Sequence, residues 1–75
     1  MESGLHCVCP GECAVVTEIA VGKALGARLR DFGLVPGTAV RCCYRSPDGR
    51  VTALALRGSV LALRTRDLQR IRVRW

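Results

Sequence analysis

The chain has 75 residues, with 12 basic and 6 acidic side chains and a formal net charge of +6 at neutral pH. This length fits a single domain over residues 1–75 and excludes most enzymes that need a deep cleft. Hydrophobic residues make up 49% of the chain, which excludes a disordered tail. No uncharged stretch reaches the roughly 20 residues needed to cross a bilayer, and the start resembles no secretion signal. We therefore expect a cytoplasmic protein without direct membrane insertion.

The first half of the chain predicts a strand followed by a short helix. Valine-rich residues over about 12–19 follow a Pro-Gly turn and are typical of a strand. Over about 23–32, apolar residues recur at i, i+4 and i+7, the spacing of one buried helix face. The residues of this face are Leu25, Leu29 and Phe32.

The segment after this helix has the composition of a helix end. Gly33 is placed to adopt the left-handed conformation, Leu34 to pack back against the helix, and Pro36 to prevent its continuation. Pro36 and Gly37 then form a turn. We expect this segment to be chiefly structural. Its apolar residues beside a short helix are also a plausible place for a protein partner to bind.

The next segment predicts a strand that leads into a tight turn. Val40, Cys42 and Tyr44 alternate with more polar neighbours and are expected to share one face. Residues 46–49 carry proline at the second position and glycine at the fourth, which is typical of a type I turn. Cys43 is expected to face outward by the same alternation.

A second hairpin is predicted immediately afterwards. The strand over 51–57 is expected to end at Gly58-Ser59, a two-residue turn with glycine at its first central position. Leu61 and Leu63 then face inward on the following strand. Thr65 is placed to cap a single helical turn through residue 68.

The last residues predict a strand with one solvent-exposed face. Apolar residues alternate there with arginines, which must point away from the apolar row. The apolar members are Ile71, Val73 and Trp75. About five short strands, one helix and a helical turn predict a mainly β protein, a small SH3-like and partly open β-barrel.

Three motifs in this order resemble the ferrous iron transport protein A (FeoA) family. They are the opening turn Pro10-Gly11-Glu12, the helix exit over 28–37, and the hairpin and strand over 56–64. The resemblance covers about residues 5–74. It implies an SH3-like accessory or regulatory protein of bacterial ferrous iron uptake, with no cofactor and no catalytic residues. It also implies contact with the cytosolic part of the ferrous iron permease, the family's GTPase-containing protein B.

Three apolar residues are candidates for this contact. Leu34 and Val35 belong to the helix exit, and Val60 stands where many relatives have a polar or long residue. The turn at 46–50 is shorter than in many relatives, so contact through that loop is in doubt. The sequence leaves open whether the protein activates or restrains the permease, and whether it self-associates weakly.

The N-terminal segment holds a cluster of soft metal ligands, His6, Cys7, Cys9 and Cys13. Structural zinc sites usually combine two separated pairs of ligands, and no second pair follows here. We therefore predict no metal site and reduced thiols, with adventitious soft-metal binding or bridging between molecules as the alternative.

Two other functions compete with an accessory role. The first is an SH3-like domain related to the C-terminal domain of iron-dependent repressors, although the chain lacks the helices of a DNA-binding motif. The second is a small basic RNA-binding barrel, but three scattered aromatic residues make a poor stacking platform, and no nucleic acid is expected. The arginines that such a barrel would use are Arg64, Arg66, Arg70, Arg72 and Arg74. The absence of a phosphate-binding loop and of a nucleophile–base pattern argues against an enzyme.

Overall fold

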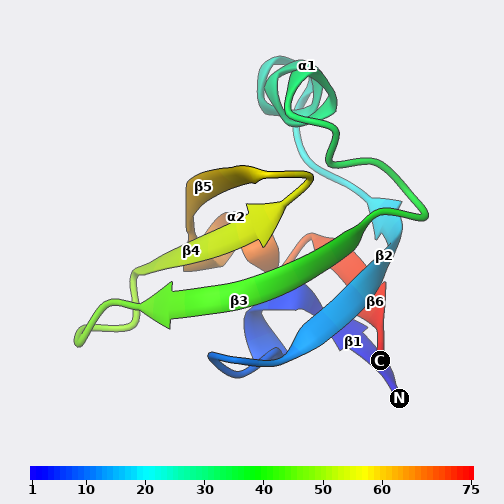
Figure 1. Ribbon diagram of the computed structural model, residues 1–75. Coiled ribbons are helices and arrows are strands. Elements are labelled where there is room, and N and C mark those ends of the chain that lie inside the picture. Colours follow the sequence, from blue (N-terminus) through cyan, green and yellow to red (C-terminus); the bar gives the residue numbers. More distant parts are fainter.

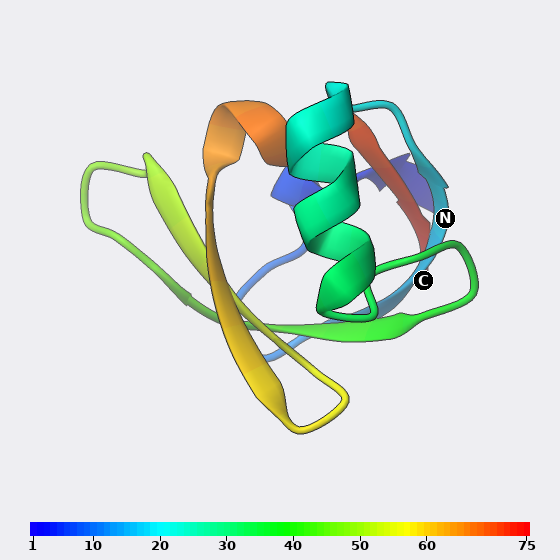
Figure 2. The ribbon, with the colours of Figure 1, turned by 90° about the horizontal axis from the view of Figure 1, so that it is seen from above.

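The computed structural model describes residues 1–75 and contains six strands in one antiparallel sheet (Figure 1). The strand order is β1-β6-β2-β3-β4-β5, so β1 and β5 form the edges and the sheet is not closed. Seen from above, the strands curve around the interior and α1 lies in front of it, at one end (Figure 2). The predicted mainly β, partly open SH3-like barrel is confirmed. Its elements are β1 (Glu2–Gly4), the 3-10 helix η1 (Leu5–Cys7), β2 (Cys13–Ile19), α1 (Lys23–Asp31), β3 (Ala39–Arg45), β4 (Val51–Leu56), β5 (Ser59–Arg64), α2 (Thr65–Leu68) and β6 (Ile71–Arg74).

The first strand was not predicted from the sequence. β1 pairs with β6, and the Met1 ammonium group donates a hydrogen bond of 2.8 Å to the carbonyl of Trp75. The amide of Trp75 in turn donates to the carbonyl of Met1 at 2.9 Å. A strand of three residues is too short to show a period in its sequence, so only pairing with the other end of the chain identifies it.

The core is one cluster of buried hydrophobic side chains contributed by nearly every element. Leu61 and Leu63 face inward, as predicted, and Ile71 and Val73 are completely buried. Cys42 is also in the cluster, where a thiol packs as a small hydrophobic group. The 15 members are Leu5, Val8, Ala14, Val16, Leu29, Leu34, Val40, Cys42, Leu54, Leu56, Leu61, Leu63, Leu68, Ile71 and Val73.

Helix α1 ends in a Schellman motif. Gly33 has a φ of +86°, its amide donates to the carbonyl of Arg30 at 2.9 Å, and the amide of Leu34 donates to the carbonyl of Leu29 at 2.9 Å. Leu29 and Leu34 are both buried, which supplies the apolar contact of this motif. The helix end at Gly33 is confirmed. The prediction for Phe32 was wrong: its side chain is 43% exposed, because the reversal at Gly33 brings Leu34 into the core instead.

A β-bulge in β3 changes which side chains face the core. Cys42 pairs with Leu54, but the next pair is Tyr44 with Ala53, so two residues of β3 oppose one of β4. The extra residue disrupts the alternation. Tyr44 is therefore 57% exposed, contrary to the prediction, while Arg45 is half-buried.

The second hairpin turns one residue earlier than predicted. Leu56 pairs with Ser59, so the central residues are Arg57 and Gly58, not Gly58 and Ser59. Both have positive φ, +48° and +80° respectively, as a type I′ turn requires. The first hairpin agrees with the sequence, since the amide of Gly49 donates to the carbonyl of Ser46 at 2.8 Å.

Thr65 does not cap α2 as predicted. The residue before the helix is Arg64, which makes no side-chain capping bond, and Thr65 is the first helical residue. Its hydroxyl donates instead to the carbonyl of Gly49 in the β3–β4 turn. The helical turn itself ends at Leu68, as predicted.

Candidate functional site

The loop that follows α1 is anchored by a buried threonine. Thr38 is 3% exposed, and its hydroxyl donates to the carbonyl of Gly33 at 2.8 Å and accepts from the amide of Val35 at 3.3 Å. The amide of Thr38 also donates to the carbonyl of Val35 at 3.0 Å. Sequence reasoning missed this residue. Threonine directly after a Pro-Gly turn was the available signal, because threonine hydroxyls often bond to nearby backbone groups in turns.

The three predicted contact residues differ in their exposure to solvent. Leu34 is completely buried, so it cannot touch a partner while the fold is intact. Val35 is half-buried beside it, and Val60 is 69% exposed on the edge strand β5. Leu34 packs inward, as the helix-exit pattern predicted, because the Schellman motif turns this side chain toward the core, and we therefore do not retain it as a contact residue. Val35 and Val60 remain available for contact.

A groove of about 400 Å³ lies along one side of α1. Its hydrophobic residues come from the end of β2, the following loop and the helix exit, and two glycines keep the helix side open. The positive charges of Lys23 and Arg30 border it. The lining residues are Ile19, Val21, Gly22, Lys23, Gly26, Arg30, Val35 and Pro36.

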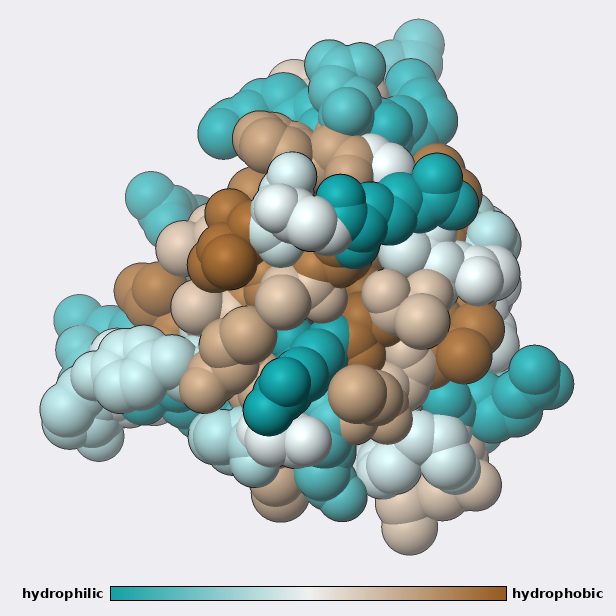
Figure 3. Space-filling view, in the orientation of Figure 1, coloured by the Kyte–Doolittle hydropathy of each residue, from teal (hydrophilic) through white to brown (hydrophobic).

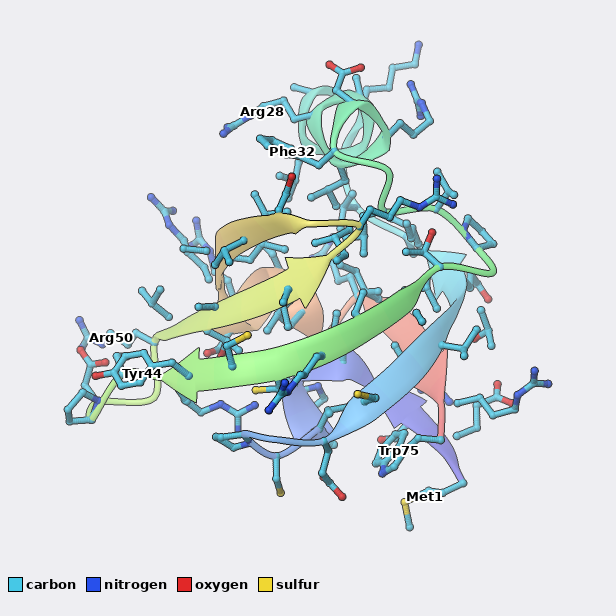
Figure 4. All side chains as sticks on the ribbon, in the orientation of Figure 1. Met1, Arg28, Phe32, Tyr44, Arg50 and Trp75 are labelled. Carbon is cyan, nitrogen blue, oxygen red and sulfur yellow. The ribbon has the colours of Figure 1, made fainter.

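Further exposed hydrophobic side chains lie near the end of α1. Phe32 projects from the helix end, and Val60 is three residues beyond Arg57 in the β4–β5 hairpin (Figure 4). A Cβ placed on Gly33 would lie 2.9 Å from Cδ of Arg57, so the helix end contacts that hairpin. Figure 3 shows hydrophobic residues at the surface below the hydrophilic outer face of α1. We call Phe32, Val35, Pro36 and Val60 the helix-flanking surface.

The predicted soft-ligand cluster does not assemble into a metal centre. Sγ of Cys7 lies 3.5 Å from Nε2 of His6 and accepts a hydrogen bond of 3.4 Å from the hydroxyl of Ser3. Cys9 and Cys13 lie on either side of the turn before β2. The structure contains no group of three or more histidine, cysteine or acidic side chains that could hold a metal ion together.

The five cysteines are free in the structure and fall into two classes. Cys42 is buried, and burial raises the pKa of its thiol above the ordinary value, although the positive charge of Arg45 acts in the opposite direction. Cys43 is exposed, as the alternation predicted. The other exposed thiols are Cys7, Cys9 and Cys13.

The C-terminal arginines do not form a single basic face. Arg72 pairs across strands with Glu18, and Arg74 with Glu2, so β6 carries acidic neighbours on both sides. Arg64 and Arg66 line a separate groove near α2. The three aromatic side chains, Phe32, Tyr44 and Trp75, lie far apart at the periphery (Figure 4). They do not create the continuous stacking surface of a single-strand binder.

Membrane crossing by a helix is excluded by size and composition. None of the three helices has the length and apolar content that a bilayer span requires.

Comparison with known protein families shows to which family this chain belongs. The model of the FeoA domain matches residues 4–74, which is nearly its whole length. The chain belongs to the FeoA family. The resemblance noted in its turn, helix-exit and hairpin motifs is thereby confirmed, and so is the assignment to ferrous iron transport. No curated protein sequence matches the chain significantly.

Solved structures of FeoA proteins have the same fold. The solution structure of FeoA from Chlorobium tepidum is 30% identical, with a TM-score of 0.91 over 95% of this chain and 68% of that protein. A crystal structure of an iron uptake regulatory protein, also named FeoA, is 26% identical, with a TM-score of 0.84 over 99% and 97% of the two chains.

The SH3-like fold is shared with part of a metal-dependent repressor. A manganese-dependent transcriptional repressor matches with a TM-score of 0.82 at 18% identity, over 97% of this chain and 41% of the repressor. At this identity the likeness shows the fold alone. The SH3-like fold of this FeoA chain is therefore also present in part of a repressor, as the repressor-domain alternative in the sequence predicted.

Proposed function

We propose that this FeoA chain is a cytosolic accessory protein of ferrous iron uptake that regulates the ferrous iron permease by direct contact and performs no chemistry itself. The observation that carries the proposal is the FeoA family match over residues 4–74. Beyond the family match, we propose that the permease is the partner, that the protein is cytosolic and that it performs no catalysis.

The helix-flanking surface supports a role in protein contact. Phe32 and Val60 are large hydrophobic side chains that are 43% and 69% exposed. Phe32 directly precedes Gly33, and Gly33 contacts Arg57 of the hairpin that carries Val60. Scattered exposed hydrophobic residues are ordinary, so the proposal is that one partner contacts these side chains together. The adjoining groove of about 400 Å³ would accept an apolar side chain of a partner between α1 and the helix-exit loop.

The framework around this surface is rigid enough to present it. Thr38 and the Schellman motif hold the helix exit through backbone and side-chain hydrogen bonds. Val60 is opposite Ala55 in the β4–β5 ladder, which fixes its direction. A preformed surface loses less conformational entropy when it binds than a disordered one.

The decisive experiment is a binding assay with the purified cytosolic GTPase domain of the permease. Val60→Asp and Val35→Asp should weaken binding by about tenfold or more if these residues are desolvated in the complex. Tyr44→Asp is the matched control, because Tyr44 is 57% exposed at a distant hairpin (Figure 4). Circular dichroism and thermal unfolding should show that all three variants fold.

The same variants should be compared in cells for permease-dependent ferrous iron uptake. We expect Val60→Asp to change uptake while Tyr44→Asp does not. Undetectable binding of the unmodified chain to the permease domain, with and without guanine nucleotide, would refute the proposed partner. Equal effects of Val60→Asp and Tyr44→Asp would refute the proposed surface. Leu34→Asp is not informative, because it places a carboxylate in the core.

A further inference from the structure

A second groove, on the side of the molecule near α2, is lined by three arginines. It has a volume of about 480 Å³ and lies between the β3–β4 turn, the end of β5 and α2. We call it the arginine groove. Its charged lining residues are all basic, and no carboxylate lines it. The lining residues are Gly49, Arg50, Val51, Arg64, Thr65, Arg66 and Gln69.

Backbone hydrogen bonds hold the arginines of this groove at fixed positions. The amide of Thr65 donates to the carbonyl of Arg50 at 2.9 Å, and the Thr65 hydroxyl donates to the carbonyl of Gly49. Arg64 is opposite Val51 in the β4–β5 ladder. These bonds connect the turn that carries Arg50 to the segment of Arg64 and Arg66, which flank Thr65. Three arginine side chains consequently start from a connected and rigid frame.

The guanidinium groups in the arginine groove have no partners within the chain. By contrast, the half-buried Arg45 donates hydrogen bonds to Thr52 and to the carbonyl of Val8. None of Arg50, Arg64 and Arg66 makes a side-chain hydrogen bond of this kind. Asp67 directly follows Arg66 but does not line the groove. Asp48, the carboxylate nearest to Arg50 in sequence, already accepts bonds from the Ser46 hydroxyl and the amide of Arg50. The planar donors of three arginines remain free for a ligand.

We propose that the arginine groove binds an anion that carries two or more linked phosphate groups. An arginine guanidinium matches phosphate oxygens with two parallel hydrogen bonds, and these bonds are strengthened by charge. A single carboxylate would neutralise one of three charges, whereas a di- or triphosphate chain brings several negative charges into one concave site. A volume of about 480 Å³ is within the usual range of small-molecule sites, about 300–1,000 Å³. Gln69 adds a neutral polar side chain to the lining, whereas the Thr65 hydroxyl already donates its proton to the carbonyl of Gly49.

The test is a titration of the isotopically labelled full chain, followed by nuclear magnetic resonance, with inorganic tripolyphosphate as the probe. Saturable shifts are expected at the amides of residues 49–51 and 64–69, and none of comparable size at α1. Arg50→Gln and Arg64→Gln should each weaken binding by about tenfold, the usual effect of losing a charge-assisted contact. Arg28→Gln removes the same charge on α1, away from Arg50 (Figure 4), and should leave the affinity nearly unchanged.

Two further arms distinguish the source of the phosphate chain. Tighter binding of a nucleoside triphosphate than of tripolyphosphate would identify nucleotides as the ligand class, whereas equal or weaker binding would identify the inorganic chain. Either result supports the site. Equal weakening by Arg28→Gln and Arg64→Gln would show unspecific charge attraction and would overturn the proposal. The absence of saturable shifts with both probes, or tight binding of an acidic peptide or RNA alone, would overturn it too.

Discussion

The guanidinium group of Arg45 donates a hydrogen bond of 2.9 Å to the backbone carbonyl of Val8, which lies 37 residues earlier in the chain. Nε of the same side chain donates to the hydroxyl of Thr52 at 3.2 Å. Val8 and Thr52 are completely buried, so one arginine satisfies polar groups of the N-terminal segment and of β4. The β-bulge before Arg45 is what directs this side chain inward.

We predict that Arg45→Met lowers the free energy of unfolding by about 1–3 kcal/mol, the usual cost of a buried polar group that loses its partner. Urea unfolding followed by circular dichroism measures this loss. Arg41→Met is the matched control, because Arg41 is exposed on the same strand and makes no side-chain hydrogen bond. A similar loss in both variants would contradict the role of the Val8 and Thr52 bonds.

Substitution of two glycines by alanine should have opposite effects on stability. At Gly33 the φ of +86° disfavours any other residue by about 1–2 kcal/mol, and a Cβ there would also lie 2.9 Å from Cδ of Arg57. At Gly26, inside α1, a Cβ would meet Val21 at an ordinary 3.6 Å. Gly26→Ala should therefore stabilise the protein by about 0.5–1 kcal/mol through helix propensity. Thermal unfolding of both variants checks the prediction, and destabilisation by Gly26→Ala would show that the helix is strained there.

The thiols should react in two kinetic classes. The exposed Cys7, Cys9, Cys13 and Cys43 are expected to react rapidly with a thiol-specific reagent at pH 8. Cys42 should react only when the protein unfolds, because it is buried and because burial raises its pKa and so lowers its thiolate fraction. Mass spectrometry of partly labelled protein identifies the slow residue. Early labelling of Cys42 in folded protein would mean that β3 opens locally.

Asp48 should make the stability depend on pH under acidic conditions. Hydrogen bonds from the Ser46 hydroxyl and then from the Arg50 amide lower the pKa of its carboxyl group below the ordinary value. The unfolded chain therefore binds the proton more readily, and stability increases with pH in this range. The contribution is present above the ordinary pKa of about 3.9 and is lost as the pH falls through the lower folded value.

Carbon-detected magnetic resonance of the Asp48 carboxyl group measures this effect directly. Ser46→Ala removes the first of the two interactions and should move the pKa of Asp48 upward toward its ordinary value. An unchanged titration curve in Ser46→Ala would contradict the assigned cause. The comparison does not depend on global stability, provided that the variant remains folded over the titrated range.

Local patterns in the sequence were enough to locate most of the elements. The spacing of Leu25 and Leu29 and the Gly33-Leu34 pair identified α1 and its end, because helix periodicity and left-handed glycine are local properties. The turn at 46–49 and the inward face of β5 could likewise be predicted from local pattern. The family motifs lay in these same segments.

The candidate sites were less accessible to sequence reasoning. Of the candidate contact residues, Val60 is exposed and Leu34 is buried, and Thr38 and the arginine groove were missed. Arg50, Arg64 and Arg66 belong to three elements, and the β4–β5 ladder together with the bonds from Thr65 to the β3–β4 turn brings them together. Sequence spacing does not reveal such a convergence.

The sequence by itself determined the mainly β class, the helix end at Gly33 and the inward-facing leucines, because these depend on backbone preference and on periods of two or 3.6 residues. Only the tertiary structure decided the bulge that exposes Tyr44, the burial of Arg45, the pairing of β1 with β6 and the arrangement of the grooves. Each of these depends on hydrogen bonds and packing between segments far apart in the chain, whose free energies no local pattern contains.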